Sequence, residues 1–148
     1  MKKWMSFCLI AALLLLNGCS FKVKQDTFNI PENAVESIEI QKAYTDENGE
    51  TVYRSKIIDD AEDVEAICAK IRTLPVSKII SDEPNPIRST PLIIILKSEA
   101  EHRLILNEEM AFYDQMPYEY QRSDTFEDFL ALYDDLVYEE NETEAKPL

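Results

Sequence analysis

Five consecutive apolar residues, Leu92-Ile93-Ile94-Ile95-Leu96, decide the fold that this sequence predicts. Apolar runs of four to eight residues are typical of strands that are buried on both faces, because alternate side chains point to opposite sides of a sheet. We therefore expect this stretch at the centre of a sheet. Turn residues follow at 98–101, and the apolar-rich segment 102–106 then predicts a strand that pairs back with it.

The segments before this central strand predict a loop and a hairpin. Residues 81–91 contain three prolines and predict an irregular surface loop, and residues 76–80 predict a short strand before it. Polar and apolar residues alternate within 35–41, and strand-forming residues recur in 51–58. Asn48-Gly49 between them is a turn pair that tolerates positive φ, so the two segments predict a hairpin.

Two segments predict amphipathic helices. The first begins after a cap at Asp59 or Asp60 and runs to about Leu74, where Pro75 ends it. The second begins at Asp124. The apolar stripes are Val64, Ile67, Cys68 and Ile71 in the first helix, and Phe126, Phe129, Leu130, Tyr133, Leu136 and Val137 in the second.

These elements, with a further short strand at 111–113, predict one α+β domain over residues 34–138. We expect an antiparallel sheet of four to six strands, with the two helices packed on one face. The segment 19–33 before it predicts a flexible tether. The segment 139–148 after it is acidic with few apolar residues, and it predicts a disordered tail.

The N-terminus has the composition of a secretion signal. Lys2 and Lys3 precede thirteen residues, 4–16, that form a hydrophobic stretch. A membrane-spanning helix needs about 20 apolar residues, so this stretch is too short to cross a bilayer. The signal peptide is expected to cover residues 1–18, with the small residue Gly18 just before the cut.

The segment Leu16-Asn17-Gly18-Cys19 resembles the lipobox of bacterial lipoproteins. The resemblance implies cleavage between Gly18 and Cys19, and a diacylglycerol on Cys19. It also implies a protein that faces outward from the cell membrane, held there by its lipid anchor. Two acyl chains are enough for stable anchoring. The alternative is an ordinary secretory signal with an incidental cysteine.

Charge and cysteine content exclude some classes of partner and scaffold. Residues 1–18 carry two of the fifteen Lys and Arg and none of the twenty-nine Asp and Glu, so the net charge from residue 19 onward is −16. Nucleic-acid binding requires basic surfaces, and we therefore expect no nucleic-acid partner. Cys8 leaves with the signal and Cys19 carries lipid, so Cys68 has no partner for an intramolecular disulfide; its place on the apolar stripe predicts burial.

The residues for most catalytic chemistry are missing. His102 is the single histidine, which excludes a two-histidine zinc site, and it is expected to be exposed on a strand. Glycine occurs only at 18 and 49, which excludes glycine-rich phosphate loops. We expect no enzyme activity, cofactor or metal. Two alternatives stay open: a carboxylate-dependent hydrolase of cell-wall glycan, and weak Ca²⁺ binding by Asp59-Asp60 or Asp134-Asp135.

A tyrosine-rich segment is the one feature that favours binding. Tyr113, Pro117, Tyr118 and Tyr120 are expected in an irregular segment, and aromatic residues are enriched at interfaces. They form a possible binding patch for a protein of the cell envelope. The alternative is that the tyrosines cover a sheet edge or the second helix.

The segments 82–84 (Asp-Glu-Pro) and 113–120 resemble a small domain of unknown function found in exported lipoproteins of Gram-positive bacteria. The resemblance covers residues 35–138 and implies no catalytic residues. With the anchor, it favours a non-catalytic accessory or binding module of the cell envelope, whose partner and oligomeric state the sequence does not identify.

Overall fold

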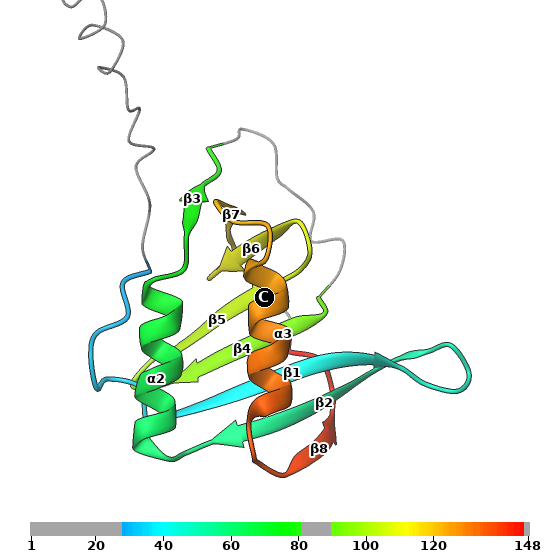
Figure 1. The fold of residues 1–148 in the computed structure, drawn as a ribbon. Helices are drawn as coiled ribbons and strands as arrows, with labels where there is room; N and C mark the ends of the chain where they lie inside the picture. Colours follow the sequence, from blue (N-terminus) through cyan, green and yellow to red (C-terminus); the bar gives the residue numbers. More distant parts are fainter. Residues whose placement is uncertain (1–27, 81–89, 147–148) are drawn as a thin grey trace, which may run out of the picture.

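The apolar run at 92–96 forms β4, Leu92–Lys97, at the centre of the sheet between β1 and β5. The computed structural model describes residues 28–80 and 90–146, and within these ranges eight strands form one antiparallel sheet in the order β3-β7-β6-β5-β4-β1-β2-β8 (Figure 1). The other elements are β1 (Ser37–Thr45), β2 (Thr51–Ile58), α2 (Ala61–Arg72), β3 (Val76–Lys78), β5 (Glu101–Leu106), β6 (Met110–Tyr113), β7 (Met116–Tyr120), α3 (Thr125–Asp135) and β8 (Glu140–Thr143). The fold class is α+β, as expected, but the sheet is larger than four to six strands.

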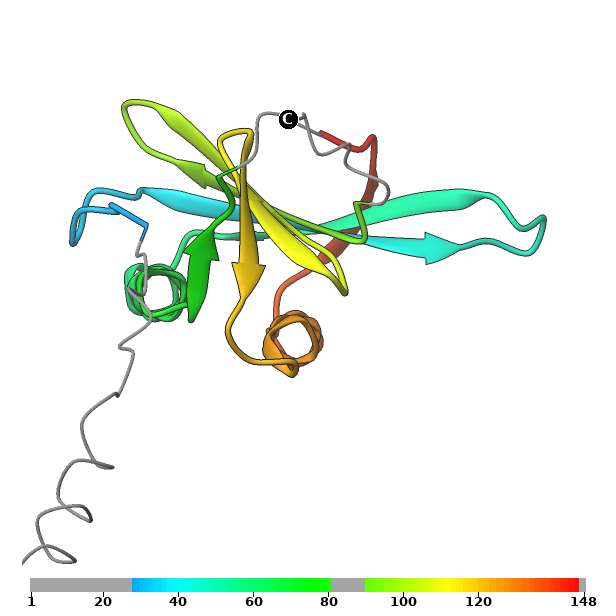
Figure 2. The ribbon, with the colours of Figure 1, turned by 90° about the horizontal axis from the view of Figure 1, so that it is seen from above.

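Both helices lie on the same face of the sheet, as the sequence predicted (Figure 2). Their apolar stripes meet the alternate side chains of β1, β4 and β5 in the main core. Leu92, Ile94 and Leu96 of β4 belong to this core and are fully buried. Ile93 and Ile95 point to the other face, where they form a second cluster with Ile105 and Phe112.

The ends of both helices are stabilised by polar contacts. The side chain of Asp60 accepts hydrogen bonds from the backbone N–H groups of Glu62 and Asp63, which confirms Asp60 as the cap of α2. At the C-terminal end of α3, the buried Lys56 donates from Nζ to the carbonyl oxygens of Tyr133 (2.7 Å) and Leu136 (2.8 Å). A cation here stabilises the negative end of the helix dipole.

Two segments that were expected to be irregular are strands. Met116–Tyr120, expected to lead irregularly into the second helix, is β7, which pairs with β3 and β6. Part of the tail that was expected to be disordered is β8, whose register with β2 runs from Tyr53↔Thr143 to Lys56↔Glu140. Val137 was expected on the helix face, but α3 ends at Asp135 and Val137 is 97% exposed.

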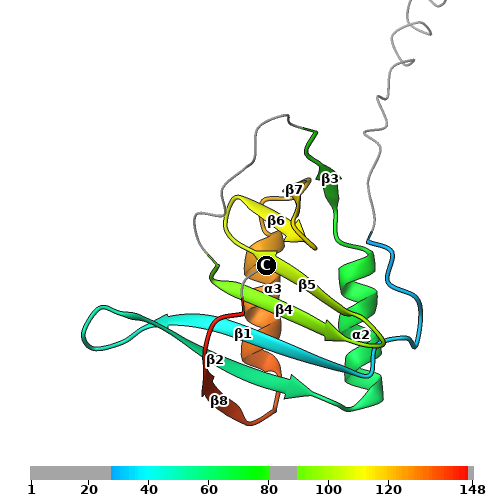
Figure 3. The same ribbon diagram turned by 180° about the vertical axis from the view of Figure 1, so that it is seen from behind.

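The last six residues of the expected tether belong to the folded body. Phe28 and Ile30 are buried in the main core. Arg72 at the end of α2 donates from Nε to the carbonyl oxygen of Ile30 at 2.7 Å, and its guanidinium pairs with Glu65 at 2.7 Å. We call residues 28–33 the docked segment. It starts beside the C-terminal end of α2 (Figures 1 and 3).

The chain after β8 crosses to the face of the sheet without helices (Figure 3). Gln41 of β1, which is fully buried, donates to the carbonyl oxygen of Glu144 at 3.3 Å and accepts from the backbone N–H of Lys146 at 2.9 Å. Lys146 Nζ contacts both carboxylate oxygens of Glu39, at 2.9 and 3.1 Å. Residues 144–146, the C-terminal strap, are therefore fastened to the middle of the sheet.

Candidate functional site

The turn between β6 and β7 has a backbone conformation that its residues rarely adopt. Tyr113 pairs with Met116, so Asp114 and Gln115 form a two-residue turn, with φ values of 46° and 73°. Two positive φ angles in succession are typical of a type I′ hairpin turn, in which Asn-Gly or Asp-Gly is common. Glutamine at the second position carries a Cβ and is strained there. Strain of this kind clusters at functional sites.

Asp114 fastens this turn to β5. Its side chain accepts from the backbone N–H of Arg103 at 2.9 Å and lies 2.6 Å from His102 Nδ1. Its own backbone N–H donates to the carbonyl oxygen of Arg103 at 2.9 Å. His102 is on a strand with 42% of its side chain exposed, as expected, but the pairing with Asp114 twelve residues later is not visible in the sequence.

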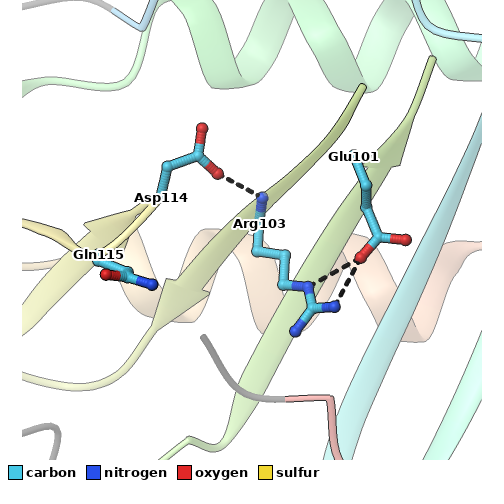
Figure 4. Close-up of a pocket in the computed structure, with 4 residues that line it drawn as sticks. All are labelled: Glu101, Arg103, Asp114 and Gln115. Atoms are coloured by element: carbon cyan, nitrogen blue, oxygen red, sulfur yellow. Dashed lines mark hydrogen bonds and ion pairs between the residues drawn. The ribbon is translucent and has the colours of Figure 1, made fainter. Parts of the chain in front are cut away.

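A pocket of about 290 Å³ opens beside this turn, lined by Glu101, Arg103, Asp114 and Gln115 (Figure 4). The guanidinium of Arg103 donates to Glu101 Oε1 from Nε at 2.9 Å and from Nη2 at 2.7 Å. Both signs of charge and an amide therefore line one surface. We call these four residues the turn pocket. Such a lining can donate hydrogen bonds to a polar ligand and accept them from it.

The tyrosines of the expected binding patch face the core, and the chain's own Phe28 packs between two of them. The rings of Phe28 and Tyr113 stack with centroids 4.6 Å apart, and Phe28 meets the ring of Tyr118 edge-on at 4.9 Å. Burial, followed by the charge of Asp114, raises the pKa of Tyr113 to about 12. These two tyrosines therefore contact the docked segment.

Tyr120 and Pro117 also have structural partners. The hydroxyl of Tyr120 lies 2.9 Å from the carbonyl oxygens of Asn107 and Met110, to which it donates, and burial raises its pKa. Pro117 pairs with Phe112 in the sheet. Tyr113, Tyr118 and Tyr120 all pack against the main core. Their packing is therefore the one described by the alternative, in which the tyrosines have a structural role in covering the sheet.

The remaining candidate residues are either structural or outside the described ranges. Gly18 and Cys19 lie outside residues 28–80 and 90–146. Cys68 is buried, as expected, and burial raises the pKa of its thiol. Within the described ranges, no group of three or more His, Cys, Asp or Glu side chains could hold a metal ion. Asp60 caps α2, and Asp134 pairs with Lys42 at 2.6 Å.

Comparisons with known proteins give no relative from which a function could be transferred. Searches of protein-family models, of curated proteins and of solved structures found no match to this chain. In the part of the chain that the structure describes, no helix has the length and apolar character needed to cross a membrane. The lipobox and domain resemblances therefore stay predictions.

Proposed function

We propose that this protein is a lipid-anchored binding module on the outer face of a bacterial cell membrane, without catalytic activity of its own. The observation that carries the proposal is the order of the N-terminal residues: Lys2-Lys3, an apolar stretch of thirteen residues, and then Gly18-Cys19. That order fits a signal peptide that is cut before a cysteine destined for lipid. The structure describes the chain from Phe28, which is nine positions after the cysteine.

The turn pocket supports binding better than glycan hydrolysis. A glycoside hydrolase needs one protonated and one ionised carboxyl group on either side of the substrate. Glu101 and Asp114 do line one pocket, but Glu101 accepts from the Arg103 guanidinium, and Asp114 accepts from the Arg103 backbone N–H and contacts His102. Neither carboxylate is left without a partner from the chain itself, which favours recognition of a polar partner surface.

The anchor can be tested by substitution of the cysteine. In cells given a labelled fatty acid, Cys19→Ala is expected to abolish incorporation of the label and to leave a larger, uncut precursor. Cys68→Ala is the matched control, because it removes the buried thiol and should keep the label. Labelling that survives in Cys19→Ala would contradict the proposal.

The binding role can be tested by cross-linking from the turn pocket. A photoreactive residue at Gln115 is expected to capture a defined envelope protein in living cells, whereas the same residue at Glu47, in the β1–β2 turn, should not capture it. Both positions are exposed, and a photoreactive residue that is unbranched at Cβ meets the positive φ of position 115 as glutamine does, so neither replacement should disturb the fold. Equal capture from the two positions would speak against the pocket as the binding surface.

A further inference from the structure

Two large apolar side chains lie exposed at one end of the sheet. Among the described residues, Ile57, Ile80, Met116 and Val137 are the exposed large hydrophobics, and Ile80 has 95% of its surface exposed and Met116 40%. Single exposed apolar residues are normal on protein surfaces. A pair that lies together at one end of the fold is less common.

The register of β3 with β7, extended past the end of β3, brings these two residues close to each other. β3 pairs with β7 so that Lys78 lies opposite Tyr118, and the backbone N–H of Ile79 donates to the carbonyl oxygen of Pro117 at 3.0 Å. β3 ends at Lys78, but the Ile79 bond continues the pairing past it, and Ile80, the next residue, therefore lies close to Met116. We call these two residues the apolar tip; β3 and β7 lie together at the upper end of the molecule in Figure 1.

The apolar tip is continuous with the site where the N-terminal chain joins the body. Met116 pairs with Tyr113, whose ring stacks on Phe28, and Tyr118 meets Phe28 edge-on. Alternate residues of a strand share a face, so Met116 and Tyr118 point to the same side of β7. Phe28, the first described residue after Cys19, therefore packs against residues that neighbour the tip.

The length of the chain between Cys19 and Phe28 limits how far the body can be from a lipid anchor. Eight residues, 20–27, lie between Cys19 and Phe28. Whatever their conformation, they reach at most about 30 Å, which is about the diameter of a small domain. Phe28 therefore stays within about 30 Å of a lipidated Cys19. A body held this close meets the bilayer at an effective concentration on the order of tens of millimolar, so a small apolar contact is sufficient.

We propose that Ile80 and Met116 contact the lipid surface that carries the anchor, so that the β3–β7 end of the body faces the membrane. This inference rests on the proposed lipidation of Cys19. The net charge of −16 opposes contact over a broad surface, but a tip of two side chains touches only a small area. Glu119 points to the other side of β7 from Tyr118, and Asp114 is paired with His102.

The orientation keeps the β1–β2 hairpin away from the bilayer. The β1–β2 hairpin extends well beyond the rest of the sheet (Figure 1), and its turn carries Asp46, Glu47 and Glu50. An acidic turn is repelled by anionic headgroups. The proposed orientation therefore holds the hairpin turn in water.

Spin labels can test which end touches lipid. The acylated full chain, with Cys68→Ser to remove the competing thiol, carries a nitroxide on Ile80→Cys, Met116→Cys or, as a matched control, Glu47→Cys. Each sample is reconstituted into vesicles of phosphatidylcholine and phosphatidylglycerol. Relaxation of the label by oxygen, which enters lipid, is compared with relaxation by a water-soluble nickel chelate.

The expected result is a ratio of oxygen to nickel accessibility several-fold higher at positions 80 and 116 than at position 47. Equal ratios at the three positions, in samples whose mass shows the acylated Cys19, would overturn the proposed contact and leave the anchor intact. A mass without acyl chains in protein purified from membranes would overturn the proposed function, and this inference with it. All three labelled positions are exposed, so the labels themselves should not disturb the fold.

Discussion

At the scale of single residues, Glu39 is a carboxylate that the sheet buries among cationic partners. It is 3% exposed, and it accepts hydrogen bonds from Lys97 Nζ at 3.0 Å and from Lys146 Nζ at 2.9 Å. Gln41 donates a further bond at 2.9 Å. Burial by itself would raise the pKa of Glu39, but the bonds from Lys146, Gln41 and Lys97 outweigh it and lower the pKa to about 2.

Glu39→Gln is expected to lower the free energy of unfolding at pH 7 by about 1–3 kcal/mol, since hydrogen bonds to charged groups are lost and the lysines are partly screened by water. Because the pKa of Glu39 is lowered in the folded state, its contribution is full above its ordinary pKa of 4.5 and disappears as the pH falls toward 2. Urea unfolding at pH 7 and at pH 3 should show the difference between the two proteins shrinking. Glu36→Gln, on the exposed start of the same segment, is the control and should change little.

The positive φ of Gln115 lowers the stability of the folded state, and glycine at this position would remove that strain. A left-handed conformation costs about 1–2 kcal/mol in a residue with a Cβ, while glycine loses about 0.4–1 kcal/mol through the entropy of the unfolded chain. Gln115→Gly should therefore raise the free energy of unfolding by about 0.5 kcal/mol, measured by thermal or urea unfolding. Gln115→Val should lower it. If Gln115→Gly destabilised the protein, the amide of Gln115 would have a structural role that outweighs its strain.

At the scale of elements, the sequence predicted the helices and strands that are specified by a local signal, such as a cap, a turn pair or an apolar run. The cap at Asp59 or Asp60, the turn at Asn48-Gly49 and the apolar run at 92–96 each specify their element within a few residues. The structure has all three, with Asp60 as the cap. β7 was missed because Pro117 argues against a strand. β8 was missed because its sequence, Glu-Asn-Glu-Thr, has no apolar alternation, and it forms a strand only through its pairing with β2.

The turn pocket was missed for a similar reason. Its residues come from β5 and from a turn eleven residues later, and nothing local indicates that Asp114 bonds to His102 and Arg103. The one available signal for the turn was the pair of residues, Asp114 and Gln115, between the expected strand 111–113 and the segment that begins at Met116. Asp-Gln is an uncommon pair in type I′ turns, so the pattern did not predict a hairpin.

Removal of residues 139–148 tests whether the tail is structural. The structure predicts a loss of about 3 kcal/mol in the free energy of unfolding, because β8 and the bonds of Lys146 to Glu39 are lost and the buried Gln41 is uncovered. Asn141→Ala, which changes an exposed side chain of β8, should cost less than about 0.5 kcal/mol. A truncated chain with the unfolding midpoint of the full chain would show that the tail is dispensable.

At the scale of the whole molecule, the folded body includes more of the N-terminal chain than the sequence predicted. Phe28 and Ile30 are single apolar residues in a polar segment, without a period that would assign them to a helix or a strand. Their burial follows from the slot between Tyr113 and Tyr118, and from the bond between Arg72 and Ile30. These are contacts between distant parts of the chain.

Two N-terminal deletions measure this contribution. A mature chain that starts at Phe28 should unfold at the same urea concentration as one that starts at Ser20. A chain that starts at Ala34 should lose about 3–5 kcal/mol of stability, since it lacks a buried phenylalanine and a buried isoleucine. Equal stability of all three chains would mean that residues 28–33 are only loosely held.

The two outermost strands have a consequence for how copies of this protein behave when crowded. β3 has three residues and follows Pro75, and β8 has four, most of them exposed and polar. Long, flat, apolar rims recruit strands from neighbouring molecules and seed fibrils, whereas short polar rims do not. Both edge strands of the sheet are therefore poor templates for pairing with another copy, and we expect little edge-to-edge aggregation even at high local density.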